Sequence, residues 1–158
     1  WHDRYACVVG PAHNGLAAAR AMGCGQTRAL RPFHEAFELQ HVLGKGHFGE
    51  VYSAAERASR ELYAVRMVDR DNFSLKELVE EGKLWRMVCQ AKYIVQWFTI
   101  RAEGKTLFVI MERCQCTLAQ KLQNCLPWSL QKCVDASIQM LKALAWIHSF
   151  RIAHRNIK

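Results

Sequence analysis

The chain has 158 residues, 51% of them apolar, which is enough for one ordinary domain with a buried core. Its 22 basic and 14 acidic side chains give a formal charge of +8, but the basic residues are spread along the chain without a block of like charge. We interpret this charge as a solvated basic surface. No basic stripe alternates with aromatic residues, so nucleic acid is not expected as a partner.

The seven cysteines do not resemble a disulfide scaffold or a metal site. Their number is odd, no Cys-x-x-Cys pair occurs, and one residue separates the closest pair, Cys114 and Cys116. We expect reduced, mostly buried thiols, no bound metal and an intracellular, cytoplasmic location. No apolar run approaches the roughly 18 residues of a membrane span, and neither a span nor a signal peptide is expected. A chain that begins at Trp1 without Met is interpreted as a fragment.

Residues 1–35 are rich in Ala and Gly and are interpreted as a poorly ordered leader or linker with a short helical stretch at 16–22. From Phe37 onward, alternating apolar and polar residues predict a strand at 37–43. The segments 50–54, 62–68, 94–100 and 106–111, which turns separate, are interpreted as four further strands. After the third strand, helical spacing of apolar residues predicts a helix that begins near 74. Two further helices are predicted after the fifth strand, beginning near 117 and 129.

The first of these helices has a clear start signal and one weak point. Ser74 and Glu77 form a capping box, in which each side chain satisfies a backbone N–H at the helix start. Leu75, Val79 and other apolar residues up to Val88 are predicted to share one face. Gly82 weakens the prediction by about 1 kcal/mol relative to Ala. Together, the elements predict an α+β fold, in which a five-stranded antiparallel sheet carries one packed helix and further helices follow.

Three glycines, Gly44-x-Gly46-x-x-Gly49, lie between the first two predicted strands. Alone this motif is weak, because glycine suits any tight turn. In a dinucleotide-binding fold it joins a strand to a helix, whereas here strands flank it on both sides. It is therefore predicted to form a hairpin whose backbone N–H groups can close over phosphates.

Further residues follow this motif in an order and at separations that resemble the eukaryotic-type protein kinase domain. Val51 follows the glycines, and Arg66 stands where kinases carry a strand lysine. Glu81 matches the kinase ion-pair glutamate, with Glu80 as the alternative. Met111 to Cys114 resembles the hinge, and His154 to Lys158 resembles the catalytic-loop motif His-Arg-Asp-Leu-Lys.

The resemblance covers Phe37 to Lys158 and implies two parts of a kinase domain. One is a kinase N-lobe at 36–113, which binds nucleotide, and the other is a truncated start of the C-lobe at 114–158. The resemblance also implies ATP as the cofactor.

By the same resemblance, the glycines would cover the phosphates, Val51 and Ala64 would press on the adenine, and Met111 would be the gatekeeper. Glu112 and Cys114 would contact the adenine edge through backbone groups. The implied nucleotide site comprises Leu43, Gly44, Gly46, Gly49, Val51, Ala64, Arg66, Met111, Glu112 and Cys114.

Two substitutions depart from the catalytic pattern that the resemblance implies. Arg66 replaces the lysine that Glu81 would hold against the phosphates, and a planar fork is not equivalent to a compact ammonium. Asn156 replaces the aspartate that accepts the substrate proton, and its amide does not titrate near neutral pH. The Mg²⁺ expected for the family has no ligands in this chain, since the Asp-Phe-Gly motif is missing.

We therefore expect a fragment of a protein kinase whose parent reaction is phosphoryl transfer from ATP to protein Ser or Thr, with this chain itself inactive. The alternative is a pseudokinase, which keeps the fold and acts as a nucleotide-binding, scaffolding or allosteric module. The expected partners are ATP and a protein substrate or regulatory protein. The long helix from 129 to 149 is expected to expose an apolar face.

Overall fold

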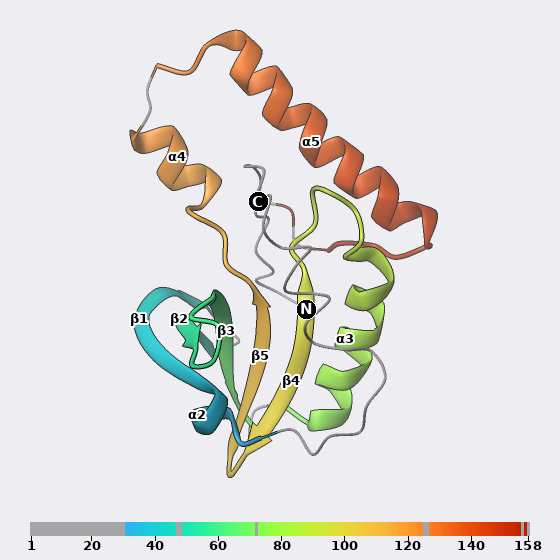
Figure 1. The fold of residues 1–158 in the computed structure, drawn as a ribbon. Helices are drawn as coiled ribbons and strands as arrows, with labels where there is room; N and C mark the ends of the chain where they lie inside the picture. The colour runs from blue at the N-terminus through green and yellow to red at the C-terminus, as the bar shows by residue number, and fades with distance from the viewer. Residues whose placement is uncertain (1–30, 47–48, 72, 125–126, 156, 158) are drawn as a thin grey trace.

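The structure is a computed structural model that describes residues 31–46, 49–71, 73–124, 127–155 and 157. The helix predicted at 16–22 lies outside these residues. The described elements form a sheet with helices beside it and beyond it (Figure 1). In chain order they are α2 (Phe33–Ala36), β1 (Phe37–Gly46), β2 (Gly49–Glu56), β3 (Leu62–Asp69), α3 (Leu75–Val88), β4 (Trp97–Glu103), β5 (Thr106–Glu112), α4 (Leu118–Asn124) and α5 (Leu130–Ser149).

The five strands form one sheet in the order β1-β2-β3-β5-β4, and each neighbouring pair is antiparallel. The predicted α+β fold is confirmed. The fourth strand starts later than its apolar pattern suggests, at Trp97 rather than at 94, because a turn precedes it in which the Ile94 N–H donates to the Ala91 carbonyl. The adjoining residue Gln96 exchanges hydrogen bonds with the end of β5.

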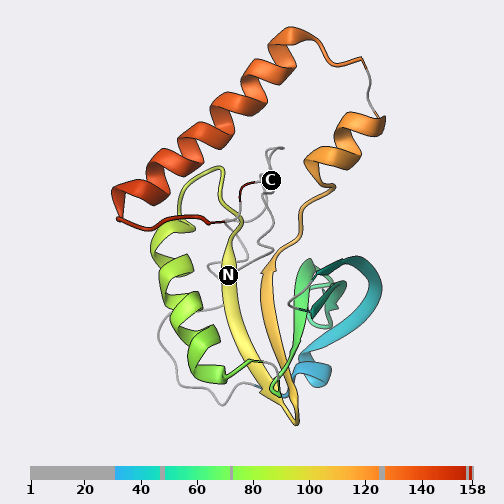
Figure 2. The ribbon, with the colours of Figure 1, turned by 180° about the vertical axis from the view of Figure 1, so that it is seen from behind.

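Side chains alternate between the two faces of the sheet, and both faces are apolar. The face that packs against α3 carries Val51, Ala64, Val68, Leu107, Val109 and Met111, and Leu78 of α3 packs on it. The opposite face carries Phe37, Ala54, Tyr63, Val65, Phe108 and Ile110, and Phe33 of α2 packs on it. Figure 2 shows α3 running beside β4, with the β1–β2 hairpin at the other edge of the sheet.

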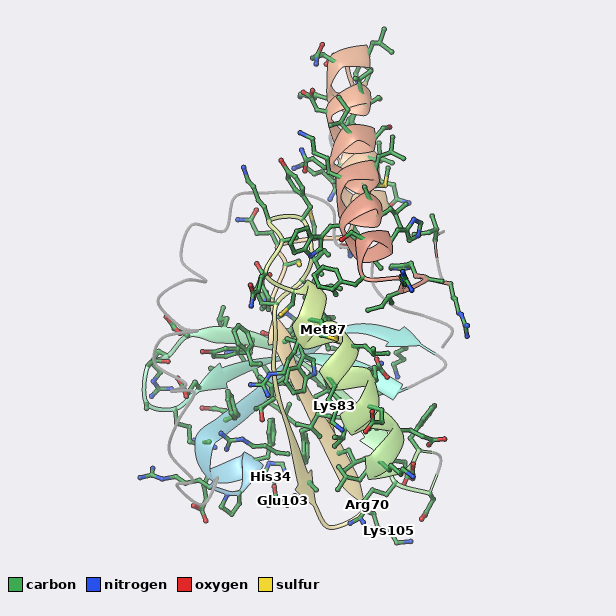
Figure 3. All side chains as sticks on the ribbon, turned by 90° about the vertical axis from the view of Figure 1, so that its right-hand side faces the viewer. His34, Arg70, Lys83, Met87, Glu103 and Lys105 are labelled. Carbon is green, nitrogen blue, oxygen red and sulfur yellow. The ribbon has the colours of Figure 1, made fainter. Side chains whose placement is uncertain are left out.

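The short helix α2 covers part of the face opposite α3. Phe33 is fully buried and stacks on Phe108, with ring centroids 3.9 Å apart and planes within 3°. His34 lies next to Glu103, with 4.0 Å between the His34 Nε2 and Glu103 Oε2 atoms (Figure 3). Phe33 falls within the range predicted to be a poorly ordered leader, so the end of that range, residues 33–35, is packed helix instead. A four-residue helix is too short to show a period, which is why the pattern did not predict it.

Helix α3 begins as predicted, with the Ser74 and Glu77 side chains each bonded to the other's backbone N–H. The prediction of its apolar face is partly wrong, since Leu75 is 40% and Val79 39% exposed. Leu78 is buried, and Val79 follows it about 100° further around the helix. The face toward the sheet is therefore narrower than the apolar pattern implies. Met87 and Lys83 lie on the outward side of α3 (Figure 3).

Helix α5 extends away from the sheet and meets α3 near its own C-terminal end (Figure 1). There, the Trp146 indole Nε1 donates to the Val88 carbonyl at 3.0 Å, and Ile147 is buried. Further along the helix, Leu130 is 81% and Leu141 65% exposed. The predicted exposed apolar face is confirmed. None of the described helices combines the length and apolarity that crossing a bilayer requires.

Candidate active site

The glycine motif lies in a hairpin between β1 and β2, with strands on both sides as predicted. Gly44 pairs with Val51 and Gly46 with Gly49 across the two strands. Gly49 has φ +112°, and a Cβ atom there would lie 1.9 Å from the Met67 carbonyl oxygen. Any side chain at Gly49 would therefore force the hairpin away from β3. The tip of the hairpin, residues 47–48, lies outside the described residues.

Three polar side chains at the base of the hairpin form a network that the motif did not predict. The Lys45 ammonium lies 2.6 Å from the Glu50 carboxylate, and the Tyr52 hydroxyl donates to the same carboxylate. These two hydrogen bonds, first from Lys45 and then from Tyr52, lower the pKa of Glu50. Lys45 and Glu50 are directly opposed across the strands. A hairpin centred on the glycines places Lys45 opposite Glu50, so this ion pair could have been predicted from the sequence.

Arg66 and Glu81 form an ion pair between β3 and α3. Their Nη2 and Oε1 atoms are 3.4 Å apart, and their side chains are only 8% and 15% exposed. The alternative, Glu80, instead bonds Lys83 at 2.6 Å, with both side chains more than half exposed. The structure therefore brings Glu81, not Glu80, to the strand cation. Arg66 lies directly opposite Val51, close to the glycine hairpin.

Glu81 is positioned by close packing of α3 against β4. A Cβ atom on Gly82 would lie 2.7 Å from the Trp97 ring, so only glycine allows this approach. The Trp85 indole donates to the Val95 carbonyl at 2.8 Å and joins the same helix to the segment before β4. The glycine that weakened the helix prediction is thus the residue that lets α3 approach the sheet.

The apolar residues predicted to surround the adenine lie together on one face of the sheet. Val51, Ala64 and Met111 are buried in a single cluster, and the half-buried Leu43 packs against it. They come from four different strands, and Arg66 shares their face because it lies two residues after Ala64 on β3. The structure therefore gathers these predicted residues around the ion pair.

The predicted hinge, Met111 to Cys114, begins with the last two residues of β5. The Glu112 N–H donates to the Gln96 carbonyl at 2.9 Å, and its carboxylate accepts from the Gln96 N–H at 3.0 Å. These bonds tie the end of β5 to the segment before β4, a link that sequence reasoning missed because it depends on tertiary pairing. The roles predicted for the Glu112 carbonyl and the Cys114 N–H stay predictions.

The expectation of reduced, mostly buried thiols is wrong in two respects. Cys114 is disulfide-bonded. Three other described cysteines carry thiols, of which Cys89 is buried, Cys116 half-buried and Cys133 exposed. Composition alone does not determine which cysteines are buried, since Cys133 lies on a helix that is largely exposed. No group of three or more His, Cys, Asp or Glu that could hold a metal ion occurs in the described part of the chain.

The other predicted catalytic position, Asn156, lies outside the described residues. Its neighbour Arg155 has φ +61°, a left-handed backbone conformation that is uncommon for residues other than glycine. The structure therefore describes the predicted site residues of the sheet, α3 and the hinge, but not Asn156.

A family model described as the protein kinase domain matches residues 37–158, which is most of the chain. This chain belongs to the protein kinase domain family. The kinase domain is 28% identical over 130 residues to the serine/threonine-protein kinase cst-1 of Caenorhabditis elegans, covering 81% of this chain and 26% of that protein. It is 26% identical over 131 residues to the serine/threonine-protein kinase hippo of Drosophila melanogaster, covering 82% and 19%.

A third relative of this kinase domain is the serine/threonine-protein kinase 4 homolog B of Dictyostelium discoideum, 30% identical over 124 residues that cover 77% of this chain and 11% of that protein. The chain thus spans about a quarter or less of the length of these relatives.

Proposed function

We propose that this chain binds ATP beneath the β1–β2 hairpin and does not itself transfer the phosphoryl group. The observation that carries the proposal is the buried Arg66–Glu81 ion pair. It places a cation next to the glycine hairpin, on the face lined by Val51 and Ala64. A hairpin of bare backbone amides, a fixed cation and an apolar wall are the parts that bind a nucleotide.

The residues present fit an anionic group. The Nε atom of Arg66 is buried and has no hydrogen-bond partner among the described residues. A buried donor without a partner is costly, and a phosphate oxygen would satisfy it. Arg66 and the hairpin would hold the phosphates, while Leu43, Ala64 and Met111 would contact the base. Bound ATP would supply the transferable γ-phosphoryl group.

The proposed inactivity rests on the chemistry of two side chains. Asn156 stands at the position of the catalytic aspartate, and an amide cannot accept the proton of a substrate hydroxyl. The loss of such a base typically costs about 10²–10⁴-fold in rate. Arg66 keeps the charge of the usual lysine but not its shape. The parent reaction that we propose, transfer from ATP to protein Ser or Thr, is supported by the names of the relatives.

A second candidate function is that of a pseudokinase module, which binds a nucleotide and acts on a protein partner as a scaffold or allosteric element. The observation that favours it is the closed ion pair in a site with an altered base. Both candidates share the nucleotide site, and an intracellular location is proposed for either.

Calorimetric titration of the 158-residue chain with ATP, with and without Mg²⁺, tests the proposal. We expect saturable binding that Gly46→Asp weakens at least tenfold, because the added carboxylate would repel the phosphates. The matched control is Gly104→Asp in the β4–β5 turn, where φ is +56° and an added Cβ atom would have no neighbour within 4 Å. Equal affinity of the two variants, or no binding by the wild type, contradicts the proposal.

A kinase assay with labelled ATP and a general protein substrate tests the proposed inactivity. We expect no transfer above background by the wild-type chain. Transfer that disappears in Gly46→Asp would show that the chain is an active enzyme.

A further inference from the structure

The glycines leave the end of the β1–β2 hairpin with few side chains that could fix how its two strands pair. The pairing is irregular between Leu39 and Val42 and again between Val42 and Gly44. Beyond these irregularities the described residues form three opposed pairs, which are Gly44 with Val51, Lys45 with Glu50, and Gly46 with Gly49. Register is weakly specified in glycine-rich strands. Of these three pairs, Lys45 with Glu50 is the one in which both residues carry a side chain.

The contacts of this pair lie on the outer face of the hairpin. The Lys45 Nζ lies 2.6 Å from the Glu50 carboxylate, and the Tyr52 hydroxyl donates to the same carboxylate. Because side chains alternate along a strand, Glu50 and Tyr52 point away from the face that carries Val51 and, opposite it on β3, Arg66. The three polar side chains therefore lie on the far side of the hairpin from the proposed phosphates, and would act on them through the backbone.

We propose that Lys45 and Glu50 are positioning residues, whose ion pair fixes the register of the glycine hairpin and so holds its backbone N–H groups in place for the phosphates. Tyr52 orients the Glu50 carboxylate for this pair. A slip of one residue would place Lys45 opposite Gly49 or Val51 and separate the two charges. The ion pair therefore favours the observed register over its nearest alternatives. This inference rests on the proposed nucleotide site and adds residues that shape the site without touching the ligand.

Hydrogen exchange of the backbone amides, measured without nucleotide, tests the effect on the hairpin itself. We expect Lys45→Gln and Glu50→Gln each to speed exchange in residues 44–51 by about threefold, a modest change because the pair is partly exposed. The matched control is Lys105→Gln in the β4–β5 turn, which removes the exposed ion pair with Asp71 at 3.3 Å (Figure 3). It is expected to leave exchange in the hairpin unchanged.

Calorimetric titrations with ATP and with adenosine test the consequence for binding. We expect each single variant to weaken ATP binding by about threefold and to leave adenosine binding unchanged, because adenosine has no phosphate beneath the hairpin. The two variants change the net charge in opposite directions, so a simple charge effect on ATP would weaken one and strengthen the other. The double variant Lys45→Glu/Glu50→Lys restores opposite charges at the same two positions, and is expected to recover ATP affinity and slow exchange.

Several results would overturn the inference. These are opposite effects of Lys45→Gln and Glu50→Gln on ATP affinity, equal losses for ATP and adenosine, and a double variant that recovers neither readout. Unchanged hydrogen exchange in residues 44–51 of both single variants, with ATP binding intact in the wild type, is a failure of this inference alone. If the wild-type chain binds no nucleotide, the proposed function itself fails.

Discussion

At the scale of single residues, the adjacent glutamates Glu80 and Glu81 differ in their partners and in their burial. Both lie on α3, yet Glu81 reaches a buried cation and Glu80 an exposed lysine. The removal of one member of a buried pair leaves the other charge without compensation. An exposed pair contributes about 0–1 kcal/mol.

We therefore expect Glu81→Gln to lower the free energy of unfolding by roughly 3 kcal/mol. Glu80→Gln, the matched control one residue away, should change it by less than about 0.5 kcal/mol. Urea unfolding of the two variants measures the difference. Similar losses in both would show that Glu81 does not hold a buried charge.

A second residue-scale prediction concerns Tyr63. Its ring is buried, and its hydroxyl donates to the Glu61 carboxylate at 3.1 Å. Burial, and then this hydrogen bond, raise the pKa of Tyr63 above its ordinary value of 10.0. A raised folded-state pKa means that the contribution to stability is complete below about pH 10 and declines as the pH rises further.

We expect the wild-type chain to lose stability above about pH 10 more steeply than Tyr63→Phe, which has no hydroxyl to ionise. Melting temperatures from about pH 8 to 11 provide the comparison. Tyr93→Phe, in the loop after α3, controls for the loss of a hydroxyl elsewhere. Parallel curves for wild type and Tyr63→Phe would contradict the assignment.

At the scale of elements, α2 extends the sheet's second core beyond the range of the family match, which begins at residue 37. Phe33 is fully buried against Phe37 and Phe108. We expect Phe33→Ala to lower the free energy of unfolding by about 3–5 kcal/mol, the usual cost of removing a buried aromatic ring. Glu35→Ala, exposed on the same helix, should cost less than about 0.5 kcal/mol. Equal effects in chemical denaturation would place α2 outside the domain.

The elements also show how far the sequence determines the structure. The apolar patterns were sufficient to predict that five strands and α3 exist, but β4 begins three residues later than predicted, at Trp97, and the buried face of α3 is narrower than its pattern. The start of α3 was predictable from Ser74 and Glu77, since a capping box is local. The packing of Trp97 on Gly82 was not, because it joins a helix to a strand that is distant along the chain.

The same distinction applies to the site. The glycine spacing and the position of Arg66 predicted the face that we propose binds the nucleotide, because the kinase resemblance preserves order and separation. The choice of Glu81 over Glu80 needed the structure, since a shift of one residue moves a helical side chain by about 100°. The disulfide at Cys114 had no local signal in its sequence neighbourhood.

At the scale of the whole molecule, α5 exposes an apolar surface that includes Val134, Ile138 and Leu141. Such a surface favours association in water. We expect the 158-residue chain to self-associate as its concentration rises. Leu141→Glu should raise the dissociation constant about tenfold, because burial of a leucine side chain contributes about 1.5–3 kcal/mol.

Light scattering coupled to size-exclusion chromatography measures this association. Lys132→Gln makes the same change in net charge on the other side of α5 and should leave the association unchanged. A wild-type chain that stays monomeric at every concentration, or equal effects of the two substitutions, would contradict the prediction.

Hydrogen exchange of backbone amides, with and without ATP, tests most directly whether a nucleotide binds beneath the β1–β2 hairpin. We predict that ATP slows exchange in residues 44–51 and around Arg66, and leaves the β4–β5 turn and α2 unchanged. Protection confined to other regions, or no protection at saturating ATP, would contradict the assignment of the site.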